Sequence, residues 1–181
     1  QYSYWNNSLR AHDFDGDGND DLIMAGNPGR IVLLRNDGRG NFREFTAYQS
    51  GGPVASDTLA NPARGDWDGD GLPDLITGDA SGYLTYRPGT SDPLVYGAPV
   101  FLRENGRIFH RTAGTTGSIQ GPQEARWGYL QPTLGDWDGD GRNEIITNDI
   151  KGELLLLTPA GDPAEVNAAP FTLNGKPLPA A

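Results

Sequence analysis

The sequence contains no cysteine, so disulfide bonds do not hold this chain together and cysteine usage does not indicate its redox compartment. No apolar run is long enough to cross a bilayer, which argues against a transmembrane segment. No N-terminal signal peptide is recognisable, and we interpret the start at Gln1 as that of a processed or trimmed chain. Positive charge is also scarce: 14 Lys and Arg face 24 Asp and Glu, for a net charge of −10. This balance argues against a nucleic-acid partner.

Glycine and proline are abundant, with 26 and 14 residues, while hydrophobic residues make up only 36% of the chain. Such a composition is typical of either disorder or a turn-rich β protein. Short apolar runs such as "RIVLL" and "ELLLL" recur at regular places, and no helical period extends over a useful length. The sequence therefore predicts an all-β fold, and 181 residues are enough for a genuine core.

An internal repeat organises the chain. "DFDGDGNDDLI" starts at Asp13, "DWDGDGLPDLI" at Asp66 and "DWDGDGRNEII" at Asp136. Each acidic loop is followed by a short apolar strand, a glycine turn and a second apolar strand, which predicts a hairpin. We expect a single β-propeller segment, residues 1–181, with three units at about 1–55, 56–116 and 117–181.

An outer hairpin belongs to the same repeat. Asn105-Gly106 and Asn174-Gly175 each stand between apolar residues, a strong signal for a two-residue turn. We expect the first unit to lack this outer hairpin and to have "NFREFTAYQS" as its outer strand. The prediction is three four-stranded antiparallel propeller blades. Because closed propellers typically have 4–8 blades, further blades of the same polypeptide or a homo-oligomer would complete the ring.

The acidic loops follow the pattern D-x-D-G-D-G-x-x-[DE], which is suited to a hard cation with oxygen ligands. Acids at positions 1, 3, 5 and 9 and a backbone carbonyl at position 7 predict about three structural Ca²⁺ sites. Their residues are Asp13, Asp15, Asp17, Asn19 and Asp21 in the first, Asp66, Asp68, Asp70, Leu72 and Asp74 in the second, and Asp136, Asp138, Asp140, Arg142 and Glu144 in the third.

Three other interpretations of these loops are an EF-hand, a magnesium site and a metal-free turn cluster. An EF-hand requires Glu at position 12 and flanking helices, whereas position 12 is Met24, Thr77 or Thr147 and the flanks read as strands. Magnesium keeps more of its waters, and a metal-free turn cluster is the remaining alternative. The aromatic residue at position 2, Phe14, Trp67 or Trp137, is expected to pack under the next blade.

The loop pattern, the "LI" strand and the glycine hairpin resemble the FG-GAP/VCBS repeat, the blade unit of integrin-α-like β-propellers. The resemblance covers most of the chain, although the Phe-Gly…Gly-Ala-Pro element is represented only by "YGAPVF" at 96–101. It implies structural calcium and a ring of blades, often seven. Members of this family serve in adhesion, in carbohydrate binding and as polysaccharide lyases.

The segment "GSIQGPQEARWGYLQP" at 117–132 departs from the plain repeat and resembles segments of secreted bacterial FG-GAP proteins associated with polysaccharide use. Trp127 and Tyr129 are of the type that stacks on sugar rings, and Arg126 is of the type that pairs with a uronate carboxylate. The alternative is a blade-closing strand with core aromatics. A lyase would also need an acid and a base, for which His12 and His110 are the available histidines.

We therefore expect a non-enzymatic recognition or scaffold module that binds a polysaccharide or glycoprotein surface. A polysaccharide lyase acting by β-elimination and a protein–protein adhesion module are the alternatives. No P-loop, dinucleotide fingerprint or nucleophile elbow is present. Loops of this kind need millimolar calcium, which indicates an extracellular, periplasmic or cell-surface location.

Overall fold

The computed structural model describes residues 9–26, 29–56, 59–115 and 122–177. Over these ranges the chain is all-β, with one 3-10 helix, η1 (Pro122–Arg126), and no α-helix. None of the described helices is long and apolar enough to span a membrane. The expected all-β class is therefore confirmed.

Two sheets have the predicted four antiparallel strands. The first sheet runs in the order β1 (Leu9–His12), β2 (Asp21–Gly26), β3 (Arg30–Asn36) and β4 (Phe42–Thr46). The second sheet runs in the order β7 (Asn61–Gly65), β8 (Asp74–Gly78), β9 (Leu84–Arg87) and β11 (Val100–Phe101). In each sheet the first two strands flank an acidic loop, and the next turn has a glycine at positive φ: Gly29 (103°) and Gly82 (86°).

The third sheet is larger than predicted, because it has six strands. Its antiparallel part is β14 (Gln131–Gly135), β15 (Glu144–Asn148), β16 (Leu154–Ala160) and β17 (Asp162–Pro170). The hairpin β12 (Arg103–Glu104) and β13 (Arg107–Ile108) then adds to β17 in parallel, with Arg103 opposite Glu165. The Asn105-Gly106 hairpin exists as expected, but it joins the sheet of the following repeat rather than its own.

The expectation that the first repeat lacks an outer hairpin is wrong. The hairpin of β5 (Tyr48–Gln49) and β6 (Gly52–Pro53) follows β4, and Ser50 and Gly51 form its turn, with Gly51 at positive φ. It pairs in parallel with β10 (Val95–Tyr96) of the second repeat. The remaining hairpin, β18 (Thr172–Leu173) and β19 (Lys176–Pro177), turns at Asn174-Gly175.

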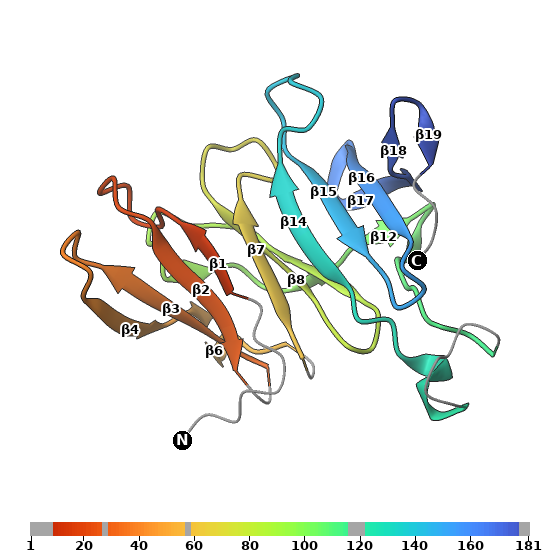
Figure 1. The fold of residues 1–181 in the computed structure, drawn as a ribbon. Coiled ribbons are helices and arrows are strands. Elements are labelled where there is room, and N and C mark those ends of the chain that lie inside the picture. The colour runs from red at the N-terminus through yellow and green to blue at the C-terminus, as the bar shows by residue number, and fades with distance from the viewer. Residues whose placement is uncertain (1–8, 27–28, 57–58, 116–121, 178–181) are drawn as a thin grey trace.

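The three main sheets stand side by side, and the second lies between the other two (Figure 1). Leu75 joins a buried cluster with first-sheet residues such as Ile23 and Leu33, whereas Ile76 joins a cluster with third-sheet residues such as Ile145. Adjacent residues of a strand point to opposite faces, so the second sheet is buried on both faces. The described residues form no closed ring, and the unit boundaries inferred from the repeat stay a prediction.

The position-2 aromatics have unequal environments. Phe14 and Trp67 are buried as expected, and the indole Nε1 of Trp67 donates to the carbonyl oxygen of Pro163 at 2.7 Å. Arg64, from β7, lies over the Phe14 ring and donates to the Phe14 carbonyl oxygen at 3.2 Å. Trp137, in contrast, is 52% exposed, so the prediction that it packs under a neighbouring blade is wrong within this chain.

Candidate metal sites and an aromatic pair

The three acidic loops share one backbone conformation. They connect β1 to β2, β7 to β8 and β14 to β15, at the same end of the sheets (Figure 1). The glycines at positions 4 and 6 have positive φ in every loop, for example 76° at Gly16 and 87° at Gly18. Glycine adopts this conformation at little cost, so the tight curl predicted from the pattern follows from the two glycines.

The carboxylate at position 1 of each loop accepts hydrogen bonds that stabilise the tight curl of the backbone. The N–H groups of Gly16 and Gly18 donate to the two oxygens of Asp13, both at 2.8 Å. Asp66 and Asp136 accept the corresponding pairs of N–H bonds at 2.7–3.1 Å. These bonds direct the side chain into the loop, where its remaining lone pairs are available to a cation.

The acid at position 9 is buried in all three loops and closes each loop at its base. Asp21 accepts from the N–H groups of Phe14 and Asn36, and Asp74 accepts from those of Trp67, Asp68 and Gly89. Glu144 accepts from the N–H of Trp137 at 2.8 Å. The position-9 carboxylates therefore have a structural role in the loop.

Three acids in each loop bring ligand atoms to within 4.8 Å of one another. The clusters are Asp13, Asp15 and Asp17; Asp66, Asp68 and Asp70; and Asp136, Asp138 and Glu144. Positions 1, 3 and 5 thus converge in the first two loops. In the third, Glu144 occupies the cluster because its side chain is one methylene longer than that of Asp21 or Asp74. Three oxygen clusters of this kind can each bind a metal ion.

At position 7 the structure shows hydrogen bonds from the backbone N–H groups, whereas the sequence predicts a role for the carbonyl oxygens. The backbone N–H groups of Asn19, Leu72 and Arg142 donate to the position-5 carboxylates Asp17, Asp70 and Asp140 at 2.7–2.9 Å. Their role as carbonyl ligands stays a prediction.

Electrostatics distinguish the loops. Arg35 lies against the first loop, with its Nη2 3.5 Å from Asp17 Oδ2, and offsets part of that loop's charge. Hydrogen bonds from Asn19 lower the pKa of Asp17. In the second loop, burial raises the pKa of Asp74 to about 6. The phenol of Tyr86 donates to Asp68 Oδ2 at 2.6 Å, and burial together with this bond raises the pKa of Tyr86.

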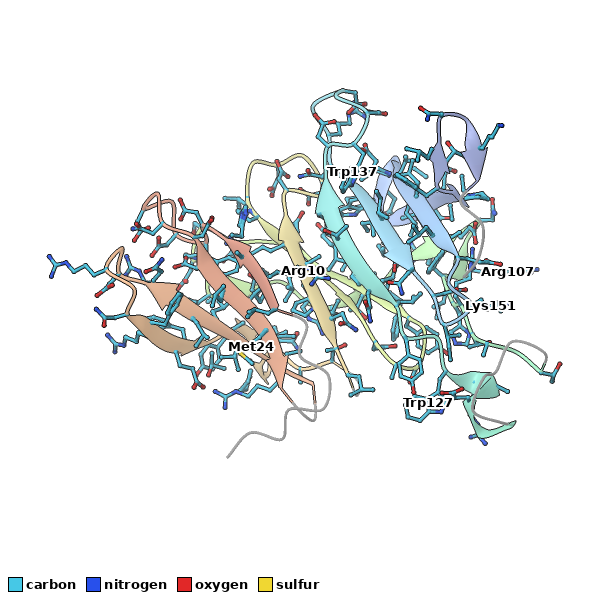
Figure 2. The ribbon with its side chains drawn as sticks, viewed as in Figure 1. Arg10, Met24, Arg107, Trp127, Trp137 and Lys151 are labelled. Carbon is cyan, nitrogen blue, oxygen red and sulfur yellow. The ribbon has the colours of Figure 1, made fainter. Side chains whose placement is uncertain are left out.

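The aromatic residues singled out in the sequence lie at the other end of the molecule. Figure 2 shows Trp127 beside η1 and Trp137 at the end of the acidic loops. The rings of Trp127 and Tyr129 are in contact, with centroids 5.3 Å apart and planes at 34°. Arg126 is exposed, and no contact between Arg126 and either ring is observed among the described residues. The structure therefore brings together two of the three predicted ligand-binding residues.

An unusual backbone presents this aromatic pair. Tyr129 has φ of 50°, which is rare for an aromatic residue. The preceding Gly128 packs so closely that a Cβ there would lie 2.1 Å from the carbonyl oxygen of Arg111. The segment is also anchored by bonds from the N–H groups of Gly128 and Leu130 to the carbonyl oxygens of Ala80 and Asp79. The pair is thus held on the framework rather than on a loose loop.

The two histidines have local partners. His12 contacts Phe14 edge to face, and burial together with the nearby Arg64 lowers its pKa. His110 stacks on Tyr83 with centroids 4.2 Å apart, and its Nε2 lies 2.9 Å from the carbonyl oxygen of Ser81. Neither imidazole is joined to Arg126 by a contact among the described residues.

Sequence reasoning missed a cavity of about 370 Å³ lined in part by Tyr83, Arg87 and Phe101. Its lining residues come from segments far apart in the sequence, so no local motif marks it. Arg87 is buried there, and its guanidinium donates to Gln49, Thr77 and Ala55. These bonds give Arg87 a structural function between the second sheet and the segment that holds the β5–β6 hairpin.

Comparisons with known proteins agree with the repeat. Residues 13–77 match the family model of the FG-GAP-like repeat, so the resemblance to FG-GAP repeats is confirmed for this part of the chain. A search of curated proteins gave no match. A solved structure of the Photorhabdus luminescens Tc holotoxin pore is similar in fold, with 21% sequence identity, a TM-score of 0.50 and coverage of 93% of this chain. The chain corresponds to only 7% of the length of that one.

Proposed function

We propose that this chain is a calcium-stabilised β-propeller module that recognises glycans at the end opposite its acidic loops. The observation that supports this proposal most strongly is the contact between the rings of Trp127 and Tyr129. The backbone that presents this pair has a positive φ at Tyr129. Strained backbone concentrates at ligand-binding positions in proteins. Both rings are half-buried, so each is fixed in place and retains accessible surface.

The chemistry of the pair suits a sugar ring. Aromatic side chains offer large, rigid apolar faces, and the phenol and the indole N–H add hydrogen-bonding groups at their edges. Burial raises the pKa of Tyr129, so its phenol stays neutral at physiological pH and can both donate and accept. Arg126 is exposed two residues before Gly128, and a uronate carboxylate is its natural partner.

Glycan binding is tested with an array of acidic and neutral polysaccharides, followed by calorimetry on the positive ones. Trp127→Ala should weaken binding at least two- to tenfold, since loss of a stacking contact costs about 0.5–1.5 kcal/mol beyond the area that it buries. Trp137→Ala is the matched control, because it removes an exposed tryptophan from the opposite end. Equal affinity of the two variants, or no binding to any glycan by the parent protein, would reject the proposal.

Assays with the same polysaccharides also test the two alternatives, a polysaccharide lyase and a protein–protein adhesion module. A polysaccharide lyase would generate unsaturated uronates, measured by their absorbance, and His110→Ala would abolish the signal. Silence on every glycan together with a captured protein partner would instead support the protein–protein adhesion module.

Calcium is proposed for the three acid clusters because each combines three carboxylates with glycine-shaped turns. Calcium accepts 6–8 oxygens in flexible geometry, and backbone carbonyls and water can complete the set. Bound ions would neutralise the repulsion within each loop and hold its hairpin in place. A need for millimolar calcium would locate the protein outside the cytoplasm, in an extracellular, periplasmic or cell-surface setting.

The metal is tested by native mass spectrometry and thermal unfolding in calcium and in chelator. We expect about three ions and a higher melting temperature in calcium, since a site at 100 times its Kd stabilises the fold by about 2.7 kcal/mol. Asp68→Asn should remove one ion, whereas Asp92→Asn, an acid outside the clusters, should leave the count unchanged. An identical transition in chelator would contradict the proposal.

A further inference from the structure

The outer hairpins of the first and second repeats each pair with a strand of the following repeat. The β5–β6 hairpin leaves the first sheet and pairs in parallel with β10, where Tyr48 is opposite Val95. The β12–β13 hairpin leaves the second sheet and pairs in parallel with β17, where Arg103 is opposite Glu165. The second contact is reinforced by the Gly106 N–H, which donates to Glu165 Oε1 at 2.7 Å. One docking mode therefore occurs twice.

The position-2 aromatics follow the same direction. Phe14 lines one cavity with Pro93 and Leu94 of the second repeat, and the Trp67 indole donates to Pro163 of the third. The receiving turns correspond: Asp92 accepts from the N–H two residues later at 2.9 Å, and Asp162 does so at 2.8 Å. Both junctions thus place an aromatic residue from an acidic loop against an Asp-Pro turn.

The third sheet has the same donating elements, but nothing receives them among the described residues. Trp137 is 52% exposed, and Leu173 on β18 is 59% exposed. Within the described chain, β18 pairs only with β19. The outward face of the third sheet is also less buried than the equivalent face of the second sheet. Ile76 and Leu84 of the second sheet are fully buried, while the aligned Ile146 and Leu154 are only half-buried.

The first sheet has the complementary side open. On the second sheet, Leu75 and Thr77 are buried on the face toward the first sheet. The aligned first-sheet residues, Leu22 and Met24, are only half-buried. At its edge, β4 pairs only with β3 in the part of the chain that the structure describes, and Phe42 on it is 47% exposed. The described residues therefore leave the receiving face of the first sheet uncovered.

Charge favours the same pairing. Arg39, in the β3–β4 turn, and Arg43, on β4, are exposed at the receiving edge. The exposed acids of the third loop, Asp136, Asp138 and Asp140, stand at the donating end. The β3–β4 turn corresponds to the β16–β17 turn, which lines a cavity with Asp66 and Asp68 of the second loop. The turn that bears Arg39 would thus face an acidic loop.

We propose that the third sheet of one chain docks head to tail on the first sheet of a second copy, as the second sheet docks on the third within the chain. In this contact, Trp137 lies against the Asp37 turn of the other copy, and β18–β19 adds to its β4 edge. Asp37 makes the same bond as Asp92 and Asp162, since its Oδ1 accepts from the N–H two residues later at 2.8 Å. The two surfaces differ, so the interface is heterologous and leads to a ring or an open chain.

The test is sedimentation velocity over a range of protein concentrations in millimolar calcium. The parent chain should associate, and Trp137→Glu and Phe42→Glu should each be monomeric, with a loss of affinity of at least tenfold. Both residues are exposed, so both variants should keep the melting behaviour of the parent monomer. Phe101→Glu is the matched control, because Phe101 is similarly exposed but belongs to neither surface.

Mixing the two monomeric variants gives the sharpest result. Trp137→Glu keeps an intact first sheet and Phe42→Glu keeps an intact third sheet, so an equimolar mixture should form a one-to-one dimer and nothing larger. A parent chain that stays monomeric, variants that associate as the parent does, or a mixture that stays monomeric would each overturn the proposal.

Discussion

The second and third sheets carry nearly the same motif in different surroundings. Both contain the sequence D-W-D-G-D-G, and their first two strands pair with the same register around it. Trp67 is 2% exposed while Trp137 is 52% exposed, because the third sheet covers the second whereas no described element covers the third. The comparison separates what a repeat specifies by itself, its loop and hairpin, from what its neighbour supplies.

Removing each tryptophan should give the largest difference. Trp67→Ala should cost about 3–5 kcal/mol of unfolding free energy, since it leaves a cavity and an unsatisfied Pro163 carbonyl. Trp137→Ala should cost less than about 1 kcal/mol in the monomer. Urea unfolding at low protein concentration measures both. Equal losses would show that burial by the next sheet is not what distinguishes the two positions.

The last residue of the second strand should show a smaller contrast. A Cβ at Gly78 would lie 2.3 Å from the carbonyl oxygen of Leu130, so Gly78→Ala should cost at least about 2 kcal/mol. The aligned Asn148 already carries a side chain, and Asn148→Ala should change stability by no more than about 1 kcal/mol. Thermal unfolding is the measurement. Tolerance of alanine at Gly78 would contradict the close approach of Leu130.

A smaller loss of stability is expected at the contact that holds the β12–β13 hairpin, which the β18–β19 hairpin lacks within the described chain. Glu165→Ala removes the acceptor of the Gly106 N–H and a partner of Arg103, and should cost about 1 kcal/mol. Amide exchange at Gly106 should accelerate, while Gly175, in the β18–β19 turn, should already exchange rapidly in the monomer. Glu165→Gln keeps an acceptor and serves as control. Unchanged exchange at Gly106 in Glu165→Ala would argue against the docked hairpin.

A pH-dependent effect concerns the buried Asp74. Burial raises its pKa to about 6, so in chelator the folded chain retains a proton there that the unfolded chain loses near pH 4. This group therefore lowers the stability of the ion-free protein progressively as pH rises from about 4 to 6, by about 3 kcal/mol. Carboxyl-carbon NMR should give a midpoint near 6 in chelator and a lower one in calcium. A midpoint near 4 in chelator would contradict the burial effect.

Local features could be predicted from the sequence. The acidic loops, the glycine turns and the Asn-Gly hairpins depend on residues that are neighbours in the chain, and the structure contains all of them. The convergence of Asp66, Asp68 and Asp70 also follows from the two glycines that curl the loop.

Partners distant in the sequence could not be predicted in the same way. Arg103 and Glu165 are 62 residues apart, and no periodicity of either strand indicates that a hairpin will join the next sheet. The β5–β6 hairpin was missed because its turn at Ser50-Gly51 lacks the flanking apolar strands of the Asn-Gly hairpins. The exposure of Trp137 depends on what lies beside it, which its own motif does not encode.

The parallel pairing of β12 with β17 has a practical consequence for dissecting the chain. A cut at the sequence-repeat border, between residues 116 and 117, would detach the β12–β13 hairpin from the strand that holds it. A fragment that isolates one sheet must therefore include the outer hairpin of the preceding repeat and omit the outer hairpin of its own repeat. Exchanging whole sequence repeats between proteins would otherwise also replace the hairpins that join neighbouring sheets.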